Sequence, residues 1–365
     1  MPEDPAALHV VGVTATGRLM HTIRTPGAWT PFLDVFGPSG ADQPQLQGYV
    51  TEVAAGRAIN KLGIADPSTP VFPEALVVVV QTSTQPNPLL FYRYDTGQWL
   101  SMGTAPYIVG ARRVAAACGN SYPSPLSGPA FPPTARLHLA WTGPAGQILA
   151  TSAPVTGPAV TGPVVDIEYS TGASRGAFRV PALAAFDSLG PSTQSRLAGV
   201  TADGRMYQSI VTSTGWADIL TDVETAGPGD AGEIVDVALA IANVPGRLDY
   251  YGAVSGDGRA WLAVHDPVTQ GWTSWHNLEE ADFVLTGNGV VVRGRDVAEF
   301  GTFERLALAT TTEGLHVLGV TSNGQLWHQL QAGLSTQPRP GQEFRDVETV
   351  GVGADAGQFT AVAAA

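Results

Sequence analysis

Aromatic rings and planar polar side chains recur along this chain, and together they suit the recognition of a sugar. A tryptophan ring can pack on the apolar C–H face of a pyranose, while arginine, histidine or a carboxylate binds its hydroxyl groups. The candidate binding residues are Arg24, Trp29, Trp216, Trp261, Trp272, Trp327 and His328. The same tryptophans could instead pack between repeated units, and the sequence leaves both interpretations open.

The sequence contains weaker indications of a catalytic site. The chain contains no Gly-x-Ser-x-Gly elbow, Walker loop or His-Glu-x-x-His pair, so no catalytic residue is assigned. Glu279, Glu280 and Asp282 could form a carboxylate pair, but close spacing in one loop also fits a solvated surface. No cofactor is predicted.

Histidines share two repeated positions, which raises the question of a metal. His9, His138 and His316 occupy one position, and His21 and His328 occupy another. A metal site needs three or four convergent ligands with further hydrogen bonds to orient them. Duplication of the repeat explains the pattern without a metal, so none is predicted.

These residues lie in a repeated unit of strand, glycine-centred turn and strand. Asp203-Gly204, Asp257-Gly258 and Asn323-Gly324 are turn dipeptides that favour a β-hairpin. Pro88 interrupts the pattern and predicts a longer loop there. The first strand of each unit is expected at 8–14, 76–82, 137–142, 196–201, 248–254 and 315–321.

Two further strands complete each unit. One begins at a tryptophan in several copies, as at Trp29, Trp99, Trp216 and Trp272, and is expected outermost. The other is rich in alanine, and small residues suit the narrow centre of a radial structure. It is expected innermost, at 53–55, 114–117, 183–185, 237–240, 306–309 and 362–364.

The repeat runs across the two ends of the chain. Asp222-Val223-Glu224-Thr225 and Asp346-Val347-Glu348-Thr349 both lead to an alanine-rich strand, and after the second copy the chain stops. The missing hairpin is the one at 8–24, which implies ring closure. The prediction is an all-β fold: a six-bladed β-propeller of four-stranded blades, closed by pairing of N- and C-terminal strands.

The whole chain, 1–365, is expected to form this single propeller domain. Segments 56–74, 119–135 and 281–303 exceed the unit and are expected to be loops or added hairpins, with 122–133 an irregular surface loop. The blades are expected at 8–35 with 357–364, and at about 49–105, 112–168, 178–223, 233–278 and 304–347.

Composition excludes several partners. The net charge is −13, from 19 basic and 32 acidic residues, which argues against nucleic acid and anionic membranes. No apolar run is long enough for a membrane span. Cys118 is the single cysteine, and no signal peptide is visible, so a cytoplasmic protein is expected, with signal-independent export left open.

The segment from Gly17 to Arg24, with Trp29 and Phe32-x-Asp34-Val35 after it, resembles bacterial propeller lectins of the Photorhabdus lectin type and the tectonin group. The turns at 257–261 and 323–328 strengthen the resemblance. It implies a non-catalytic protein that binds monosaccharides, fucose among them, in clefts between blades. Photorhabdus-type lectins have seven blades, whereas six are counted here.

The six repeats have different side chains at the positions that would bind sugar in the lectins that the chain resembles. The residue after the turn is Met20, Phe91, Leu149, Tyr207, Trp261 or Trp327. Equivalent sugar sites would need matching side chains, so few sites are expected to work. Glycans or a small molecule are the expected ligands. The alternatives are an enzyme with a pocket on the propeller axis and a scaffold that binds a protein partner in a toxin or secretion assembly.

Overall fold

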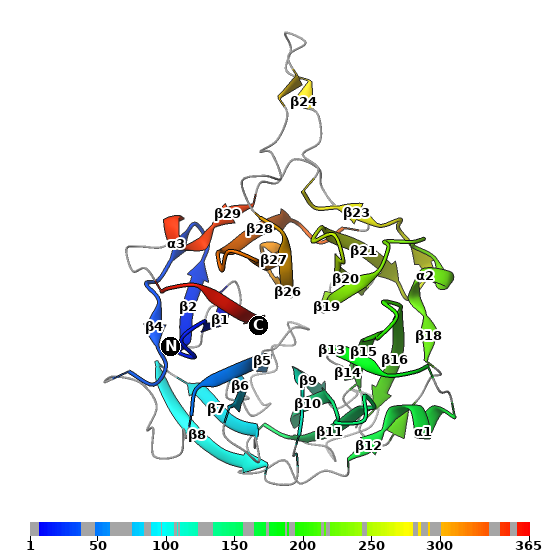
Figure 1. Ribbon diagram of the computed structural model, residues 1–365, viewed down its shortest axis with the longest axis horizontal. Helices are drawn as coiled ribbons and strands as arrows, with labels where there is room; N and C mark the ends of the chain where they lie inside the picture. The colour runs from blue at the N-terminus through cyan, green and yellow to red at the C-terminus, as the bar shows by residue number, and fades with distance from the viewer. Residues whose placement is uncertain are drawn as a thin grey trace.

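The protein is a ring of six β-sheets around a central axis in the computed structural model (Figure 1), which confirms the predicted six-bladed propeller. Below, blade 1 contains the two ends of the chain and blades 2 to 6 follow in sequence order. The structure describes residues 7–37, 48–58, 75–83, 89–95, 97–105, 108, 110–122, 134–155, 164–172, 175–186, 188–189, 194–212, 215–216, 220–242, 247–279, 284–285, 291–292, 301–335, 344–350 and 356–365.

The alanine-rich strands are innermost, as predicted. Neighbouring backbones approach so closely there that a Cβ added to Gly56 would lie 2.7 Å from the backbone nitrogen of Cys118. At this position only glycine fits without a shift of the neighbouring backbone. From blade 1 to blade 6 the inner strands are β30 (Phe359–Ala364), β5 (Val50–Ala58), β9 (Arg113–Tyr122), β13 (Phe178–Phe186), β19 (Ile234–Ala242) and β26 (Phe303–Thr311).

Each inner strand pairs with an antiparallel hairpin. The second strands are β1 (Leu8–Thr14), β6 (Ala75–Thr82), β10 (Thr134–Thr142), β15 (Gln194–Thr201), β20 (Leu248–Ser255) and β27 (Gly314–Thr321). The third strands are β2 (Leu19–Thr25), β7 (Leu89–Asp95), β11 (Ile148–Pro154), β16 (Met206–Thr212), β21 (Ala260–Asp266) and β28 (Leu326–Ala332).

The turns between second and third strands confirm the glycine prediction. Gly204, Gly258 and Gly324 have φ of +81°, +81° and +80°, which a residue with a Cβ rarely adopts. The longer loop predicted at Pro88 and the irregular loop predicted at 122–133 lie almost entirely outside the described residues. Within the predicted insertion 281–303, β24 (Val284–Leu285) pairs with β25 (Val291–Val292).

The outer strand is more broken than the sequence suggested. Among the described residues, blade 2 has one outer strand of eight residues, and blades 1, 4 and 5 have two short pieces each. They are β3 (Ala28–Trp29), β4 (Leu33–Asp34), β8 (Gln98–Ala105), β12 (Val165–Asp166), β17 (Gly215–Trp216), β18 (Thr221–Asp222), β22 (Gly271–Trp272), β23 (His276–Asn277) and β29 (Arg345–Asp346). In addition, β14 (Ser188–Leu189) pairs in parallel with β9.

In the part of the chain that the structure describes, three one-turn helices follow outer strands, although no helix was predicted: α1 (Ile167–Thr171), α2 (Val223–Ala226) and α3 (Val347–Val350). The repeated aspartate explains two of them directly. Asp166 and Asp222 each accept a hydrogen bond at 3.1 Å from the backbone N–H three residues later, which caps the helix. No helix among the described residues is long and apolar enough to span a membrane.

The ring closes by pairing the two ends of the chain. β1 pairs antiparallel with β30, with Val10 opposite Ala364 and Gly12 opposite Val362. Figure 1 shows the C-terminal strand beside the N-terminal hairpin. The closing strand is thus held by backbone hydrogen bonds and by the core of blade 1.

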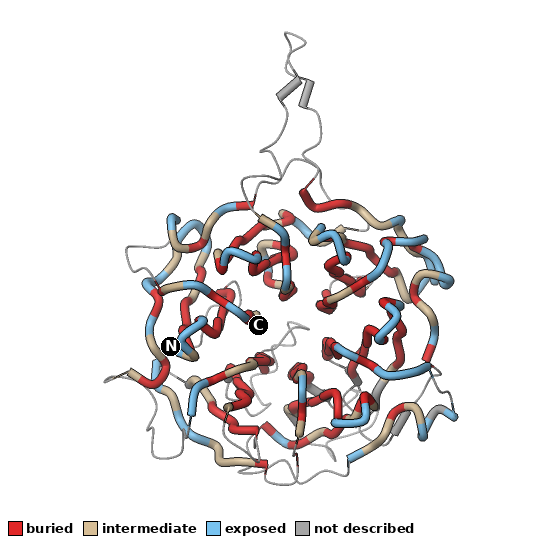
Figure 2. Tube along the Cα trace, viewed as in Figure 1, coloured by how far each residue is buried: buried red, intermediate tan, exposed pale blue. Residues whose placement is uncertain are grey.

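The core lies between blades. One cluster joins Leu8 and Val10 of blade 1 to Leu318 and Val320 of blade 6. Figure 2 shows buried residues on the inner and middle strands and exposed ones toward the rim. Each blade therefore buries its apolar faces against its two neighbours.

A glycine on the second strand makes room for a phenylalanine of the inner strand. A Cβ on Gly12 would lie 2.5 Å from the ring of Phe359, and one on Gly319 would lie 2.4 Å from the ring of Phe303. We expect Gly12→Ala to destabilise the fold by about 1–3 kcal/mol because it overpacks the closing blade. Chemical denaturation measures this.

The Phe359→Leu replacement serves as the control in a double-mutant cycle, because Phe359 lies on β30. The two changes together should cost less than the sum of the single changes. Additive costs would show that the contact across the closure is unimportant.

Candidate binding sites at the blade junctions

Each outer tryptophan lies opposite one residue of the third strand, and that residue differs between blades. Trp29 pairs with Arg24, Trp99 with Tyr94, Trp216 with Val211 and Trp272 with His265. These pairs lie at the end of the third strand that is far from the Asp-Gly turn. The register thus places a polar or aromatic partner beside a tryptophan in blades 1, 2 and 5.

The junction of blades 6 and 1 combines an ion pair with two aromatic rings. Arg24 of blade 1 forms a salt bridge with Glu313, which lies in the turn between β26 and β27. The side chains of Arg24 and Glu313 are 11% and 22% exposed. The ring of Trp29 meets the ring of His328 edge-on, with centroids 5.2 Å apart. Cation, carboxylate and apolar ring thus come from two blades to one place.

A hydrogen-bonded chain holds His328 in position. Thr311 Oγ1 is 2.8 Å from His316 Nε2, and His316 Nδ1 is 3.0 Å from His328 Nε2. The two imidazoles stack with centroids 5.3 Å apart. Burial lowers the pKa of His316 to about 3 and the pKa of His328 well below its ordinary value, and the neighbouring cations add to both shifts. Both rings are therefore neutral at neutral pH.

The junction of blades 1 and 2 repeats the stacked histidine pair. His9 Nδ1 is 3.1 Å from His21 Nε2, and the rings are stacked. His21 meets the rings of Tyr94 and Trp99 edge-on, with centroids 4.9 and 5.2 Å away. Because Tyr94 stands where blade 1 has Arg24, this junction has aromatic surface but lacks the guanidinium.

The junction of blades 4 and 5 contains the most extensive buried charge network at these positions. Asp249 is fully buried, and its carboxylate is 2.7 Å from Arg196 Nη2 of blade 4 and 3.1 Å from Arg247 Nε. His265 Nδ1 lies 3.4 Å from the same carboxylate. Burial opposes ionisation of Asp249, but the bond from His265 and the two guanidinium groups lower its pKa below the ordinary value.

Aromatic rings border this network. The centroid of Trp272 is 4.5 Å from that of His265 and 4.9 Å from that of Tyr251. Tyr251 donates a hydrogen bond to Gln208 of blade 4, and burial raises its pKa. Gly227 lies against the same tryptophan, because a Cβ there would be 2.5 Å from the indole. Trp272 is thereby held at the junction.

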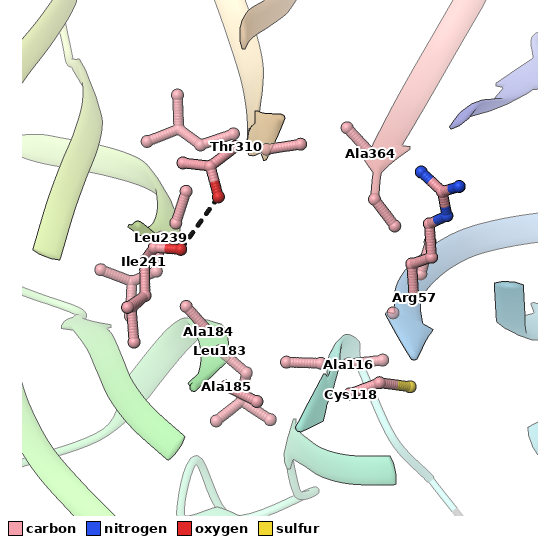
Figure 3. A pocket seen from close by; sticks show the side chains of 17 residues that line it. Arg57, Ala116, Cys118, Leu183, Ala184, Ala185, Leu239, Ile241, Thr310 and Ala364 are labelled. Carbon is pink, nitrogen blue, oxygen red and sulfur yellow. Dashed lines mark hydrogen bonds between the residues drawn. The ribbon is translucent and has the colours of Figure 1, made fainter. Parts of the chain in front are cut away.

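The axial channel is narrow and mostly apolar. A cavity of about 60 Å³ lies among the ends of the six inner strands, where alanine and leucine side chains from each blade surround it (Figure 3). A second cavity of about 100 Å³ lies further along the axis. Thr310 donates to the carbonyl of Ile241 at 2.9 Å, and Arg57 donates to the carbonyl of Ala7. Both cavities are small beside typical ligand pockets of about 300–1,000 Å³.

Four charged side chains lie at the other end of the channel, each directly before a cavity-lining segment. Arg113 is 2.9 Å from Glu52, and Arg305 reaches both Glu52 at 3.5 Å and Asp236 at 3.8 Å. They come from blades 2, 3, 5 and 6, so Arg305 links blades that are not neighbours. Burial raises the pKa of Asp236 to about 7, against the opposing effect of Arg113.

The structure brings together only part of the predicted site. Arg24, Trp29 and His328 meet at the junction of blades 6 and 1, and Trp272 lies at that of blades 4 and 5. Trp327 is a core residue that is 4% exposed.

Two predicted tryptophans stand apart from these contacts. Trp261 is partly buried near the Asp-Gly turn and donates to Ser255 Oγ at 2.9 Å. The side chain of Trp216 lies outside the described residues.

Sequence reasoning missed Glu313, Asp249, Arg196 and Arg247. Glu313 had a weak signal, because Glu313-Gly314 forms a short turn and Gly314 has φ of +147°. Arg247 and Asp249 are neighbours in blade 5, whereas Arg196 comes from blade 4 and reaches Asp249 only when the two blades are side by side.

Comparison with known proteins supports the fold. No protein-family model matches the chain, and no curated protein matches it at a significant level. The lectin of Aleuria aurantia, described as a six-bladed β-propeller that recognises fucose, has 14% identity and a TM-score of 0.58, covering 96% of this chain and 93% of its own.

Two further solved structures, one of them a lectin, agree. SapL1, solved with α-methyl fucoside, has 11% identity and a TM-score of 0.52, covering 93% of this chain and 92% of its own. AofleA from Arthrobotrys oligospora has 12% identity and a TM-score of 0.52, covering 96% and 87%. At such identities the similarity establishes a shared propeller fold.

The low pKa values of the buried pair His316 and His328 predict that acid destabilises the folded protein. His316 and His328 bind a proton near pH 6.5 when unfolded but only at much lower pH when folded. The unfolded state therefore binds more protons below pH 6.5, and the free energy of unfolding falls as the pH falls. From pH 6.5 to 5 we expect a loss of about 2 kcal/mol from His316.

The control is the double variant His316→Gln, His328→Gln, compared with the wild type by denaturation at several pH values. Its stability should change less over this range. Parallel pH profiles for the two proteins would contradict the assignment.

The raised pKa of Asp236, at the channel, predicts that this group's contribution to stability falls as the pH rises. Its folded pKa of about 7 exceeds the ordinary value, so its contribution to stability is present at low pH and is lost as the pH rises through 7. Asp236→Asn cannot ionise, so its stability relative to the wild type should rise by about 2 kcal/mol or more between pH 4 and pH 8. Thermal unfolding measures this, and a relative loss at pH 8 would instead show that pairing with Arg305 dominates.

Proposed function

We propose that this protein is a non-catalytic, carbohydrate-binding propeller whose principal sugar site lies at the junction of blades 6 and 1. The observation that carries the proposal is the grouping of Arg24, Glu313, Trp29 and His328 from two blades. A partly exposed indole provides an apolar platform, while guanidinium and carboxylate bind hydroxyl groups in a bidentate manner.

Fucose is the sugar to test first. The chain resembles propeller lectins that bind fucose, and the structural neighbours include lectins solved with fucosides. A deoxyhexose has an apolar methyl group beside three hydroxyl groups, which suits a tryptophan next to an ion pair. The junction of blades 1 and 2, with two histidines and two larger rings, is the proposed weaker site because Tyr94 stands there at the position of Arg24.

The channel gives the enzyme alternative little support. Its cavities of about 60 and 100 Å³ are lined mainly by alanine, leucine and valine, and Thr310 and Arg57 are engaged with backbone carbonyls. An active site would need a larger pocket with convergent polar groups. The scaffold alternative stays a prediction.

Calorimetry with methyl α-L-fucoside tests the proposal. Arg24→Ala should weaken binding at least tenfold, because it removes the cation and leaves Glu313 without its partner. Trp29→Ala should weaken it similarly by removing the platform.

The matched control is Arg18→Ala. Arg18 also pairs with a carboxylate, that of Asp34 at 2.9 Å, but it lies beside the Thr16-Gly17 turn, at the opposite end of the hairpin from Arg24, and its side chain is 54% exposed. Its loss should leave affinity unchanged. Equal affinity of all three variants and the wild type, or no binding across a broad glycan array, would refute the sugar site.

A further inference from the structure

We propose that Asn323 is a latent deamidation site, which the closed ring protects, and that its conversion to isoaspartate loosens the closing strand β30. The reaction needs no partner other than water. It is independent of sugar binding, because the Asn323-Gly324 turn lies at the end of the hairpin β27–β28 that is far from Glu313.

The chemistry follows from the Asn-Gly pair. Glycine has no Cβ to obstruct its own backbone nitrogen, so attack on the preceding side chain is least hindered there. The nitrogen of Gly324 loses its proton and forms a bond to Cγ of Asn323, while Nδ2 takes up a proton and leaves as ammonia. Water then opens the resulting succinimide ring. Cleavage of its bond to Cγ produces aspartate, whereas cleavage of its bond to the α-carbonyl carbon produces isoaspartate, whose main chain is one atom longer.

Hydrogen bonds within the turn oppose the first step. Gly324 N–H donates to Thr321 O at 2.8 Å, so loss of this proton also costs the hydrogen bond. Asn323 Oδ1 accepts from the Thr321 hydroxyl and from Gln325 N–H at 3.3 Å. Asn323 Nδ2 donates to Gln325 Oε1 at 3.0 Å. The side-chain amide is therefore held by Thr321 and Gln325, and the reaction requires the turn to open.

The turns of blades 4 and 5 show that an ordinary aspartate fits at this position. The Thr201 hydroxyl donates to Asp203 and the Ser255 hydroxyl donates to Asp257, both at 2.5 Å. Asn323 receives the same bond in blade 6. In blades 4 and 5 this bond lowers the pKa of the carboxyl group, so the ionised aspartate is favoured. The product that conflicts with the fold is therefore isoaspartate.

Isoaspartate disturbs the contact at which the closing strand begins. Gly324 O accepts from Phe359 N–H at 2.8 Å, and a Cβ on Gly324 would lie 2.5 Å from the Cβ of Gln358. One additional main-chain atom before Gly324 displaces its carbonyl from this close contact. Phe359 is the first residue of β30 and is buried in the core between blades 6 and 1. Damage at this turn therefore weakens the ring where it closes.

Peptide mapping by mass spectrometry tests the protection. Deamidation at Asn323 is followed in the folded full-length protein and in the same protein unfolded in urea. We expect it to be slower in the folded protein by roughly tenfold or more, since it proceeds only through opened states. The chain has a second Asn-Gly pair, Asn288-Gly289, whose rate in urea provides the reference for an unprotected pair. Equal rates at Asn323 in the folded and the unfolded protein overturn the proposal.

Variants of Thr321 identify the protecting group. Thr321→Val removes the hydroxyl that holds Asn323, and it should speed deamidation of the folded protein about fivefold, which corresponds to one hydrogen bond. Thr321→Ser is the matched control, because Ser255 occupies this position in blade 5, and it should react at the wild-type rate. If Thr321→Val does not fold, Gln325→Ala replaces it, because that change removes the acceptor for Asn323 Nδ2. An unchanged rate in the folded variant contradicts the protection.

Hydrogen exchange at the Phe359 N–H tests the effect on closure. The isoaspartyl form, separated by chromatography from protein aged in solution, should exchange at this amide about tenfold faster than the wild type. Asn323→Asp is the control, because it is the other product of the reaction, and it should exchange as the wild type does. Equal exchange in the isoaspartyl form and the wild type refutes the link between this turn and ring closure.

Discussion

The structure depends on burial of apolar faces between neighbouring blades, because no blade can bury both of its faces alone. Each cluster of the core joins residues of adjacent blades, as Leu8 and Leu318 do. Such a ring is stable only if its last interface is also formed, and the pairing of β1 with β30 completes it. The closing blade is therefore built from the two ends of the chain, and a glycine opposite Phe359 lets it pack.

Closure also creates the candidate sites. A tryptophan on the outer strand of one blade faces the preceding blade, and the residue opposite that tryptophan decides the chemistry. In blade 1 this residue is an arginine, which forms an ion pair. In blade 2 it is a tyrosine within an aromatic cluster, and in blade 5 it is a histidine next to the buried charge network. Divergence at a single register position thus changes the side chains at the junction without changing the fold.

The channel is narrow and lined mainly by apolar side chains. Alanine allows the inner strands to approach, and the cavities left between them are small. At one mouth, Glu52, Arg113, Asp236 and Arg305 connect blades that do not touch directly. Function is consequently expected at the junctions, where partly exposed polar groups and rings meet.

The sequence by itself determined the architecture. Gly204 and Gly258 indicated the hairpins, and the alanine runs indicated the inner strands. The repeat that is split across the termini predicted ring closure. Turn residues and periodicity can be recognised along a single chain, because both are local properties. The sequence also proposed Arg24, Trp29 and His328 as candidates, which the ring brings together, but it could not distinguish them from Trp327, which packs in the core. Only the tertiary structure decided that Glu313 pairs with Arg24 and that Arg196 meets Asp249. Those partners are distant in sequence, and their contacts exist only because the blades are fixed side by side in a closed ring.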